Sequence, residues 1–324
     1  MTITSLELGD EPPPDVSIVI VSCNTKHLLT RMLTAIADGK DKLRIELIVV
    51  DNASRDGSVE LLEQQFPDVQ LIANSVNVGF GRANNQALSM IRGRYVLLLN
   101  TDAFVSPDTL PKTIWFMDEH TSCGVLGVKL VGGDGELKPS CCNFPTPQNI
   151  AIKLLHLEKF FPKTPVAEDL SSDHSSLRSC DWVPGCFYLV RREVIEAIGL
   201  FDPRYFLYCE EVDHCRRVHE AGWDVTYYPY TQVVHIGFQS GASTFSDKRQ
   251  IPGFYIESLF LYLRKHHGLA AMLAIAFLMV FIDLSSAVKR SLKRDATVTQ
   301  MRLQNAWLIL RLLGKTRLAS RPTR

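Results

Sequence analysis

The chain has 324 residues, of which 46% are hydrophobic and 22% charged, a composition typical of folded soluble proteins that excludes disordered and collagen-like classes. Its formal net charge is zero, but residues 251–324 hold 12 Lys and Arg against 3 Asp and Glu, which leaves the rest of the chain acidic. A basic tail on an acidic body predicts an anionic partner surface for the tail.

The cysteines and the first residues indicate a cytoplasmic protein. Eight cysteines are too few for a disulfide framework in a chain of this length, and no CxxC pair is present to hold zinc. Residues 1–14 contain three acidic residues and lack the basic and apolar stretches of a signal peptide. We therefore expect reduced thiols and a disordered N-terminus.

From residue 15 onwards, short apolar runs rich in β-branched residues alternate with segments of helical spacing. We expect strands at 16–21, 45–50, 69–73 and 95–99, and helices at 26–37, 56–65 and 81–91. This alternation predicts an α/β fold with a mostly parallel central sheet flanked by helices. Such a sheet binds its ligand at the carboxyl ends of its strands.

The second half of the chain is less regular. Residues 138–181 contain five prolines and a Ser-rich stretch, which predicts an irregular insertion, either a lid on the acceptor side or a disordered loop. Helices are expected at 191–198 and 210–221, and strands at 224–228 and 232–235. We expect a catalytic domain over 15–248 and a helical region over 249–324.

Polar residues follow three of the predicted strands. The chain lacks the glycine patterns of dinucleotide and P-loop sites, and carries Ser22–Thr25, Asp51–Ser54 and Asn100–Asp102 at the strand ends instead. A carboxylate at Asp102 could ligate a divalent cation that also binds phosphate oxygens, and Asp51 could accept hydrogen bonds from a nucleobase or ribose. The same residue types also form ordinary turns and helix caps.

Two further motifs carry charge. The loop Asn77–Gly79, with Arg82 just after it, could present N–H groups and a positive charge to an anion, although it could equally be a plain glycine loop. Three carboxylates, Glu210, Glu211 and Asp213, begin the predicted helix 210–221. One of them could act as a general base; the alternative is a negative first turn that complements the helix dipole and pairs with nearby arginines.

The basic tail contains a membrane-like segment. Residues 269–282 are 14 uninterrupted apolar residues, fewer than the roughly 20 of a membrane span. Basic residues at 264–267 and 289–294 flank this run, and a helix is expected at 298–313, so we expect residues 269–313 to associate with an anionic membrane surface. Packing on the catalytic domain, or a homodimer contact, is the alternative. Nucleic acid is excluded, because the basic residues alternate with long apolar runs.

In this order the motifs resemble the family 2 glycosyltransferases, which have the GT-A fold, and within them the bacterial rhamnosyltransferase branch. The resemblance covers residues 16–241. The matching segments are Val16–Asn24, Val49–Ser54, Asn77–Phe80, Asn84–Asn85, Leu98–Asp102, Gly185–Arg192, Gly199–Asp202, Tyr208–Asp213 and Val233–His235.

The resemblance implies an inverting, metal-dependent transferase. The nucleotide-sugar site would comprise Ser22, Asn24, Asp51, Asn77, Gly79, Arg82, Asn100 and Asp102; Asp102 and His235 would bind Mg²⁺ or Mn²⁺; Glu211, with Glu210 and Asp213, would form the catalytic site; and Gly185 and Trp182 would line the acceptor side. Two positions depart from the family pattern. Asn100 replaces the first Asp of the DxD element, and the base position holds a Glu, which leaves both Glu211 and Glu210 open.

The same resemblance implies dTDP-rhamnose as the donor, with a UDP-sugar next, and a saccharide or lipid-linked glycan of the cell envelope as the acceptor. The protein would then lie at the inner face of the cell membrane. Two alternatives stay open: a polyprenyl-phosphate glycosyltransferase of the same fold, and a non-catalytic module that binds nucleotide sugar or glycan.

Overall fold

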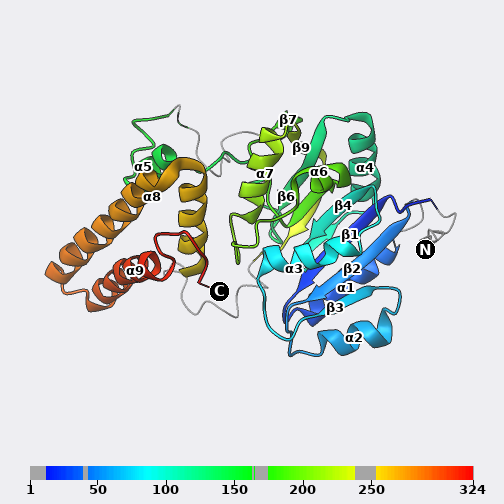
Figure 1. The fold of residues 1–324 in the computed structure, drawn as a ribbon, viewed down its shortest axis with the longest axis horizontal. Helices are drawn as coiled ribbons and strands as arrows, with labels where there is room; N and C mark the ends of the chain where they lie inside the picture. Colours follow the sequence, from blue (N-terminus) through cyan, green and yellow to red (C-terminus); the bar gives the residue numbers. More distant parts are fainter. Residues whose placement is uncertain (1–11, 39–42, 163, 165–173, 238–252, 324) are drawn as a thin grey trace, which may run out of the picture.

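The computed structural model describes residues 12–38, 43–162, 164, 174–237 and 253–323. A central sheet with helices on both faces forms one part of the molecule, and a group of C-terminal helices lies beside it (Figure 1). Residues 1–11 of the predicted disordered N-terminus (1–14), the domain boundary at residue 248 and the end of the family resemblance at residue 241 lie outside the described residues.

The sheet has nine strands within the described ranges, in the order β3-β2-β1-β4-β8-β6-β9-β5, with β7 paired to β9. The strands are β1 (Val16–Ser22), β2 (Ile45–Asp51), β3 (Gln70–Ala73), β4 (Tyr95–Leu99), β5 (Ala103–Val105), β6 (Cys123–Val131), β7 (Arg178–Ser179), β8 (Phe187–Arg191) and β9 (Asp224–His235). The first four strands run parallel, as predicted. The second half is mixed, because β8 is antiparallel to both β4 and β6, and β5 is antiparallel to β9.

Both faces of the sheet are buried. Successive side chains of a strand point to opposite faces, so in β1 the side chains of Ile18 and Ile20 enter one hydrophobic cluster and Val19 enters the other. The first cluster is covered by α1 (Lys26–Asp38), α2 (Ser58–Gln65) and α4 (Thr109–Glu119), and the second by α3 (Phe80–Gln86), α6 (Arg192–Ile198) and α7 (Glu210–Glu220). Burial on both faces explains why the parallel strands read as continuous apolar runs.

Four elements differ from the sequence-based expectation. Helix α3 ends at Gln86 and continues as a short 3-10 turn, Ala87–Ser89. Strand β9 is continuous where two strands were predicted; it passes through Pro229 because the pairing with β6 shifts register between Val128 and Lys129. Strands β5 and β6 were not predicted.

The predicted irregular insertion contains a helix, α5 (Pro147–Leu154). Thr146 caps this helix by accepting a hydrogen bond from the Asn149 N–H, and Pro147 occupies the first helical position. Ile150 and Leu154 of α5 pack against the C-terminal helices. Helix α5 therefore belongs to the helical region, whereas Ser140 at the start of the insertion bonds to β6 of the sheet. Residues 163 and 165–173 lie outside the described part.

The C-terminal region consists of α8 (Gly253–Leu292) and α9 (Ala296–Lys315). Gly268 interrupts α8 with non-helical angles (φ 86°), so the first half lies against the sheet domain, while the second half forms a hairpin with α9 that points away from it (Figure 1). Inside the hairpin the buried Asp283 accepts a hydrogen bond from Arg302 at 2.8 Å. By length and composition α8 could cross a membrane, with a mean hydropathy of 2.2 over an 18-residue window of which 28% is buried.

Candidate active site

Asp51 lies at the end of β2, beside Ser22 at the end of β1. Its side chain is 1% exposed. One carboxylate oxygen accepts a hydrogen bond from the Ser54 N–H at 2.8 Å, whereas the other, Oδ2, is buried without a hydrogen-bond partner among the described residues. A buried acceptor of this kind needs a donor, and a ligand N–H or hydroxyl could supply it.

The neighbouring Asn52 organises the loops around Asp51. Its side-chain amide donates to Asn77 at 3.0 Å and to the Gly79 carbonyl at 3.3 Å, and its oxygen accepts from the Val78 N–H at 2.9 Å. On the other side, Asn24 is tied to this motif through its N–H and its side-chain oxygen. The structure therefore brings the predicted residues Ser22, Asn24, Asp51, Asn77 and Gly79 together. Asn52 was not predicted as a site residue, because no sequence signal distinguishes it from the turn residues of the Asp51–Ser54 motif around it.

Gly79 joins this loop to the segment before α7. It has φ 91°, and a Cβ atom there would collide with the Phe206 carbonyl oxygen, which accepts a hydrogen bond from the Phe80 N–H at 2.8 Å. Only glycine fits such an approach without strain. Arg82, predicted to face an anion, donates from Nε to the Pro203 carbonyl at 2.6 Å, so this contact binds α3 to the same segment.

Asp102 and His235 meet through the pairing of β5 with β9, which sets Ala103 opposite His235. The distance from His235 Nε2 to Asp102 Oδ1 is 3.3 Å. Asp102 is 1% exposed, and its Oδ1 makes no hydrogen bond of good geometry within the described part of the chain. Burial of His235 opposes its protonation, but Asp102 and the Cys186 thiol outweigh burial and raise the pKa of His235 to about 10.

This pair fits a divalent cation held partly by the substrate. The buried Asp102 Oδ1, which makes no hydrogen bond of good geometry, and His235 Nε2 lie 3.3 Å apart, so a cation that displaced the proton from the His235 ring could bind both atoms. The described residues contain no group of three or more His, Cys, Asp or Glu that could hold a metal. Mg²⁺ and Mn²⁺ commonly take their remaining ligands from water and substrate phosphates. The Asn100 N–H donates to the Cys186 carbonyl at 3.1 Å, which fixes the first residue of the DxD element.

Glu210 and Glu211 begin helix α7, and each has a buried Oε2 atom without a hydrogen-bond partner in the described ranges. Burial raises the pKa of Glu211 to about 7. Burial, together with the charge of Glu211, raises the pKa of Glu210 well above its ordinary value. Two buried carboxylates this close in the chain oppose each other's ionisation. A carboxylate with a pKa near neutrality is suited to general-base catalysis.

Gly185 and Cys186 connect Glu211 to the Asp102–His235 pair. A Cβ atom at Gly185 would lie 3.9 Å from the Glu211 Cβ, so this residue packs against Glu211. The next residue, Cys186, contacts both Asn100 and His235. Trp182, also predicted on the acceptor side, is partly buried and donates to the Asn143 carbonyl at 2.8 Å. Trp182 therefore anchors the insertion, whereas Gly185 adjoins Glu211.

The predicted catalytic role does not fit Asp213. Its carboxylate is fully buried, and it accepts hydrogen bonds from Arg217 at 3.1 Å and His266 at 2.7 Å and pairs with Lys265 at 2.7 Å. Although burial opposes ionisation, these partners lower its pKa to about 2, so it is a poor proton acceptor.

The same contacts correct the reading of residues 264–267 as a basic flank for a membrane. Lys265 and His266 point into the protein and bind Asp213. No sequence signal links these residues to Asp213, because 52 and 53 positions separate them along the chain.

The chain is similar in sequence and fold to known glycosyltransferases. A model described as Glycosyl transferase family 2 matches residues 17–163. The N-acetylglucosaminyl-diphospho-decaprenol L-rhamnosyltransferase of Mycobacterium tuberculosis is 26% identical over 264 residues, which cover 78% of this chain and 84% of that protein. Rhamnosyltransferase WbbL of Escherichia coli is 26% identical over 261 residues, covering 77% and 93% respectively.

Among solved structures, the mannosyltransferase PcManGT of Pyrobaculum calidifontis, in complex with GDP-Man and Mn²⁺, shares the fold. The TM-score is 0.53 at 16% identity, over 96% of this chain and 90% of that one. The sheet order, the strand-end motifs and these matches together identify the protein as a GT-A-fold glycosyltransferase with a family 2 domain, similar to bacterial rhamnosyltransferases.

Proposed function

We propose that the protein transfers a sugar from a nucleotide-sugar donor to a hydroxyl group of a saccharide or lipid-linked glycan in cell-envelope synthesis. The donor is dTDP-rhamnose, with UDP-sugars as the next choice. The rhamnosyltransferases among the relatives support this donor. The observation that carries the proposal is that Gly185 and Cys186 adjoin Glu211 on one side and the Asp102–His235 pair on the other.

On the donor side, each residue has a distinct role. Asp51 accepts hydrogen bonds from the nucleobase or ribose of the donor through Oδ2, which has no hydrogen-bond partner among the described residues. Asp102 and His235 would hold Mg²⁺ or Mn²⁺, which when bound neutralises charge on the leaving diphosphate. Asn52 holds the 77–79 loop against the nucleotide by its three hydrogen bonds.

On the acceptor side, Glu211 accepts the proton of the attacking hydroxyl. The acceptor oxygen forms its bond to the anomeric carbon while the bond to the nucleoside diphosphate breaks, and the proton passes to the Glu211 carboxylate. A single displacement of this kind inverts the anomeric configuration. Burial and the charge of Glu211 raise the pKa of the neighbouring Glu210, which disfavours a second negative charge beside the proposed base.

A donor screen tests the proposal. Purified protein is incubated with dTDP-rhamnose and common UDP- and GDP-sugars, with Mg²⁺, Mn²⁺ or EDTA, and with a membrane lipid extract as the source of acceptor. We expect lipid-dependent nucleotide release from one donor, lost in EDTA and in Asp102→Ala. Glu211→Gln should lower turnover by a factor of about 10² to 10⁴ while keeping donor affinity. Glu220→Gln, an exposed position on the same helix, is the matched control.

Each alternative has its own outcome in this assay. Release that persists in EDTA would remove the metal role of Asp102 and His235. Polyprenyl phosphate acting as the acceptor by itself would favour a polyprenyl-phosphate glycosyltransferase. Donor binding without release, equal in Glu211→Gln and the unmodified protein, would point to a non-catalytic binding module.

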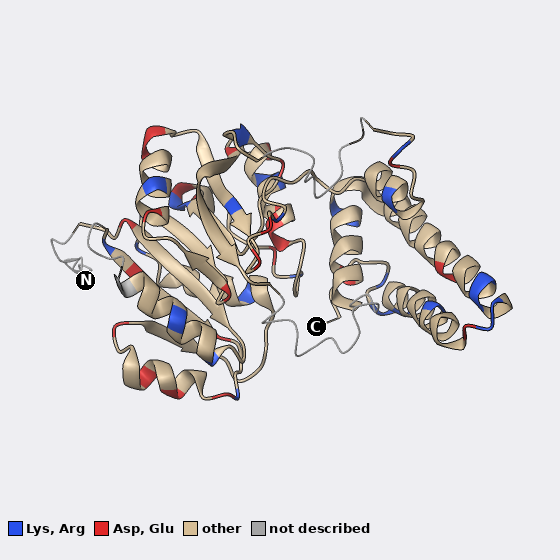
Figure 2. Ribbon diagram, turned by 180° about the vertical axis from the view of Figure 1, so that it is seen from behind, with Lys and Arg blue, Asp and Glu red and all other residues tan. Residues whose placement is uncertain are grey.

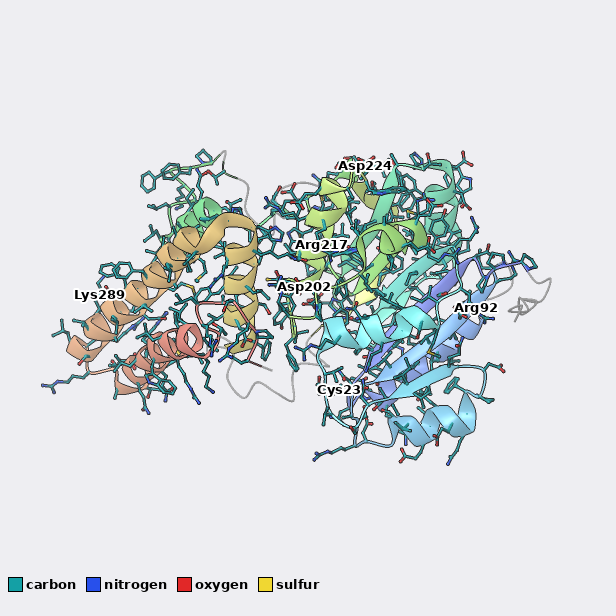
Figure 3. The ribbon with its side chains drawn as sticks, in the orientation of Figure 1. Cys23, Arg92, Asp202, Arg217, Asp224 and Lys289 are labelled. Atoms are coloured by element: carbon teal, nitrogen blue, oxygen red, sulfur yellow. The ribbon has the colours of Figure 1, made fainter. Side chains whose placement is uncertain are left out.

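We also propose that the α8–α9 hairpin docks on the inner face of the cell membrane. Seven apolar residues with spacings of three or four lie exposed along α8: Leu269, Leu273, Phe277, Phe281, Leu284, Val288 and Leu292. Trp307 and Leu310 are exposed on α9. Basic residues mark the far end of the hairpin, where Lys289 is labelled (Figures 2 and 3). Apolar stripes with basic ends suit an anionic bilayer surface.

Vesicle flotation tests the docking proposal. The double change Phe277→Glu and Phe281→Glu should abolish flotation with vesicles containing about 30% anionic lipid. Trp115→Glu, at an exposed aromatic residue on α4, should float like the unmodified protein. Vesicle-independent dimerisation that the same double change disrupts would instead assign the stripe to a homodimer contact.

A further inference from the structure

The position of the proposed base depends on where helix α7 begins, and the start of this helix lacks an ordinary cap. The N-cap residue is Cys209, which makes no side-chain capping bond within the described residues. Both Tyr208 (φ 72°) and Cys209 (φ 64°) are left-handed, a conformation that is unfavourable for residues other than glycine. Other contacts must therefore fix the first turn of α7.

Those contacts come from α8 and converge on Asp213, two residues after Glu211. Lys265 Nζ lies 2.7 Å from Asp213 Oδ1, and His266 Nε2 lies 2.7 Å from the same atom. Arg217, one turn further along α7, donates to the other carboxylate oxygen at 3.1 Å. The carboxylate is fully buried, so it depends on these partners for its stabilisation.

Lys265 extends the network to the segment that leads into α7. Its ammonium group also lies 2.9 Å from Asp202, which pairs in turn with Arg204 at 2.6 Å. Asp202 and Arg217 lie on the side of the sheet domain that faces the C-terminal helices (Figure 3). We call Asp202, Asp213, Arg217, Lys265 and His266 the α7–α8 clamp.

Apolar contacts surround the clamp. Leu261 and Tyr262 of α8 form a buried cluster with Cys209 and Val212 at the start of α7. Ser258 of α8 donates a hydrogen bond to the Leu207 carbonyl at 2.9 Å. The first half of α8 is thus packed along the whole approach to the catalytic helix.

We infer that Lys265 and His266, from the C-terminal helix, are positioning residues that set the place of Glu211 through Asp213. The inference rests on the proposed role of Glu211 as the base. Glu211 packs on Gly185, where a Cβ atom would lie 3.9 Å from the Glu211 Cβ, so a small rotation of α7 changes the reach of the carboxylate. Displacing a catalytic group by about 1 Å can lower the rate by about 100-fold.

The test replaces Lys265 by Met, which keeps the length of the side chain and removes its charge. We expect kcat to fall by about 10- to 100-fold, while donor affinity, measured by titration, stays within about twofold. In Lys265→Arg, kcat should stay within about threefold of the unmodified protein, because the guanidinium can pair with the carboxylates of both Asp202 and Asp213. The matched control is Lys112→Met on α4, away from α7, which breaks a 2.6 Å ion pair with the N-cap residue Asp108.

Hydrogen exchange adds a readout that does not require turnover. Amides at the start of α7 should exchange about tenfold faster in Lys265→Met than in Lys112→Met. If Lys265→Met does not fold, Asp202→Asn is the second variant: it removes one ion-pair partner of Lys265 and leaves the pair with Asp213. We then expect smaller changes, in the same direction, in kcat and in hydrogen exchange at the start of α7.

Three outcomes would overturn the inference. The first is a folded Lys265→Met protein with the kcat of Lys112→Met, and the second is a loss of kcat that only follows a loss of donor affinity. The third is unchanged exchange at the start of α7. Absence of turnover in the unmodified protein with every donor would instead refute the proposed function, and hydrogen exchange alone would then decide whether the clamp holds α7.

Discussion

The acidic limb of the pH profile is a direct consequence of the burial of Glu211. A base must be ionised to accept a proton, and burial raises the pKa of Glu211 from 4.5 to about 7. As the pH falls through 7 the carboxylate gains a proton, so kcat/KM should fall with it. Relative to its plateau at high pH, kcat/KM should be about one half at pH 7, about one tenth at pH 6 and about one hundredth at pH 5.

The assay is nucleotide release at saturating metal between pH 5 and 9, with the melting temperature recorded at each pH. In Glu220→Gln, kcat/KM should still fall as the pH is lowered. In Glu211→Gln, kcat/KM should be low and independent of pH in this range. Asp213, with a pKa of about 2, stays ionised throughout, so its protonation cannot produce the fall. A limb near pH 4.5, or one that survives in Glu211→Gln, would refute the reasoning.

Two further substitutions give expected magnitudes. Gly79→Ala should lower the free energy of unfolding by about 2–4 kcal/mol in denaturant melts, because Gly79 has a φ of 91° and an added Cβ would collide with Phe206. Gly222→Ala is the control: it has a φ of 84° but no described atom within 4 Å of its Cβ, so the loss should be only about 1 kcal/mol. Equal losses in the two variants would argue against the collision. Asn100→Asp adds a carboxylate to the DxD element beside Asp102, and should lower the Mn²⁺ concentration for half-maximal activity about tenfold; an unchanged metal requirement would place residue 100 outside the metal site.

The fold was predictable where local pattern alone decides it. The alternation of apolar strands and helices up to residue 99 gave the parallel half of the sheet, because burial on both faces leaves a clear apolar run in each strand. The second half was not predictable in this way. Strand β5 has only three residues, and β9 passes through Pro229, a residue that normally argues against a continuous strand. Both depend on pairing between distant segments.

In the candidate site, too, local sequence patterns identified some residues, whereas the roles of others depend on contacts between distant segments. Asp51 and Asp102 follow apolar strands directly, so a local pattern pointed to them, and the structure leaves an oxygen of each without a hydrogen-bond partner among the described residues. The three carboxylates of α7 could not be told apart by pattern, because their difference lies in their surroundings. Glu211 packs against Gly185, and Asp213 contacts Lys265 and His266 of a helix more than 50 residues away.

The contacts of Asp213 link the sheet domain to the C-terminal region. Three basic side chains pair with the buried Asp213 in the structure: Arg217, Lys265 and His266. Removing Lys265 and His266 would leave Arg217 as the remaining one. A buried charge with too few partners is costly. The acidic start of α7 is therefore compatible with a stable fold only when the first half of α8 is in place. Since the second half of α8 carries the proposed membrane surface, one helix joins that surface to α7, which carries the proposed base. The sheet domain alone, ending before residue 253, lacks the partners that hold its proposed base.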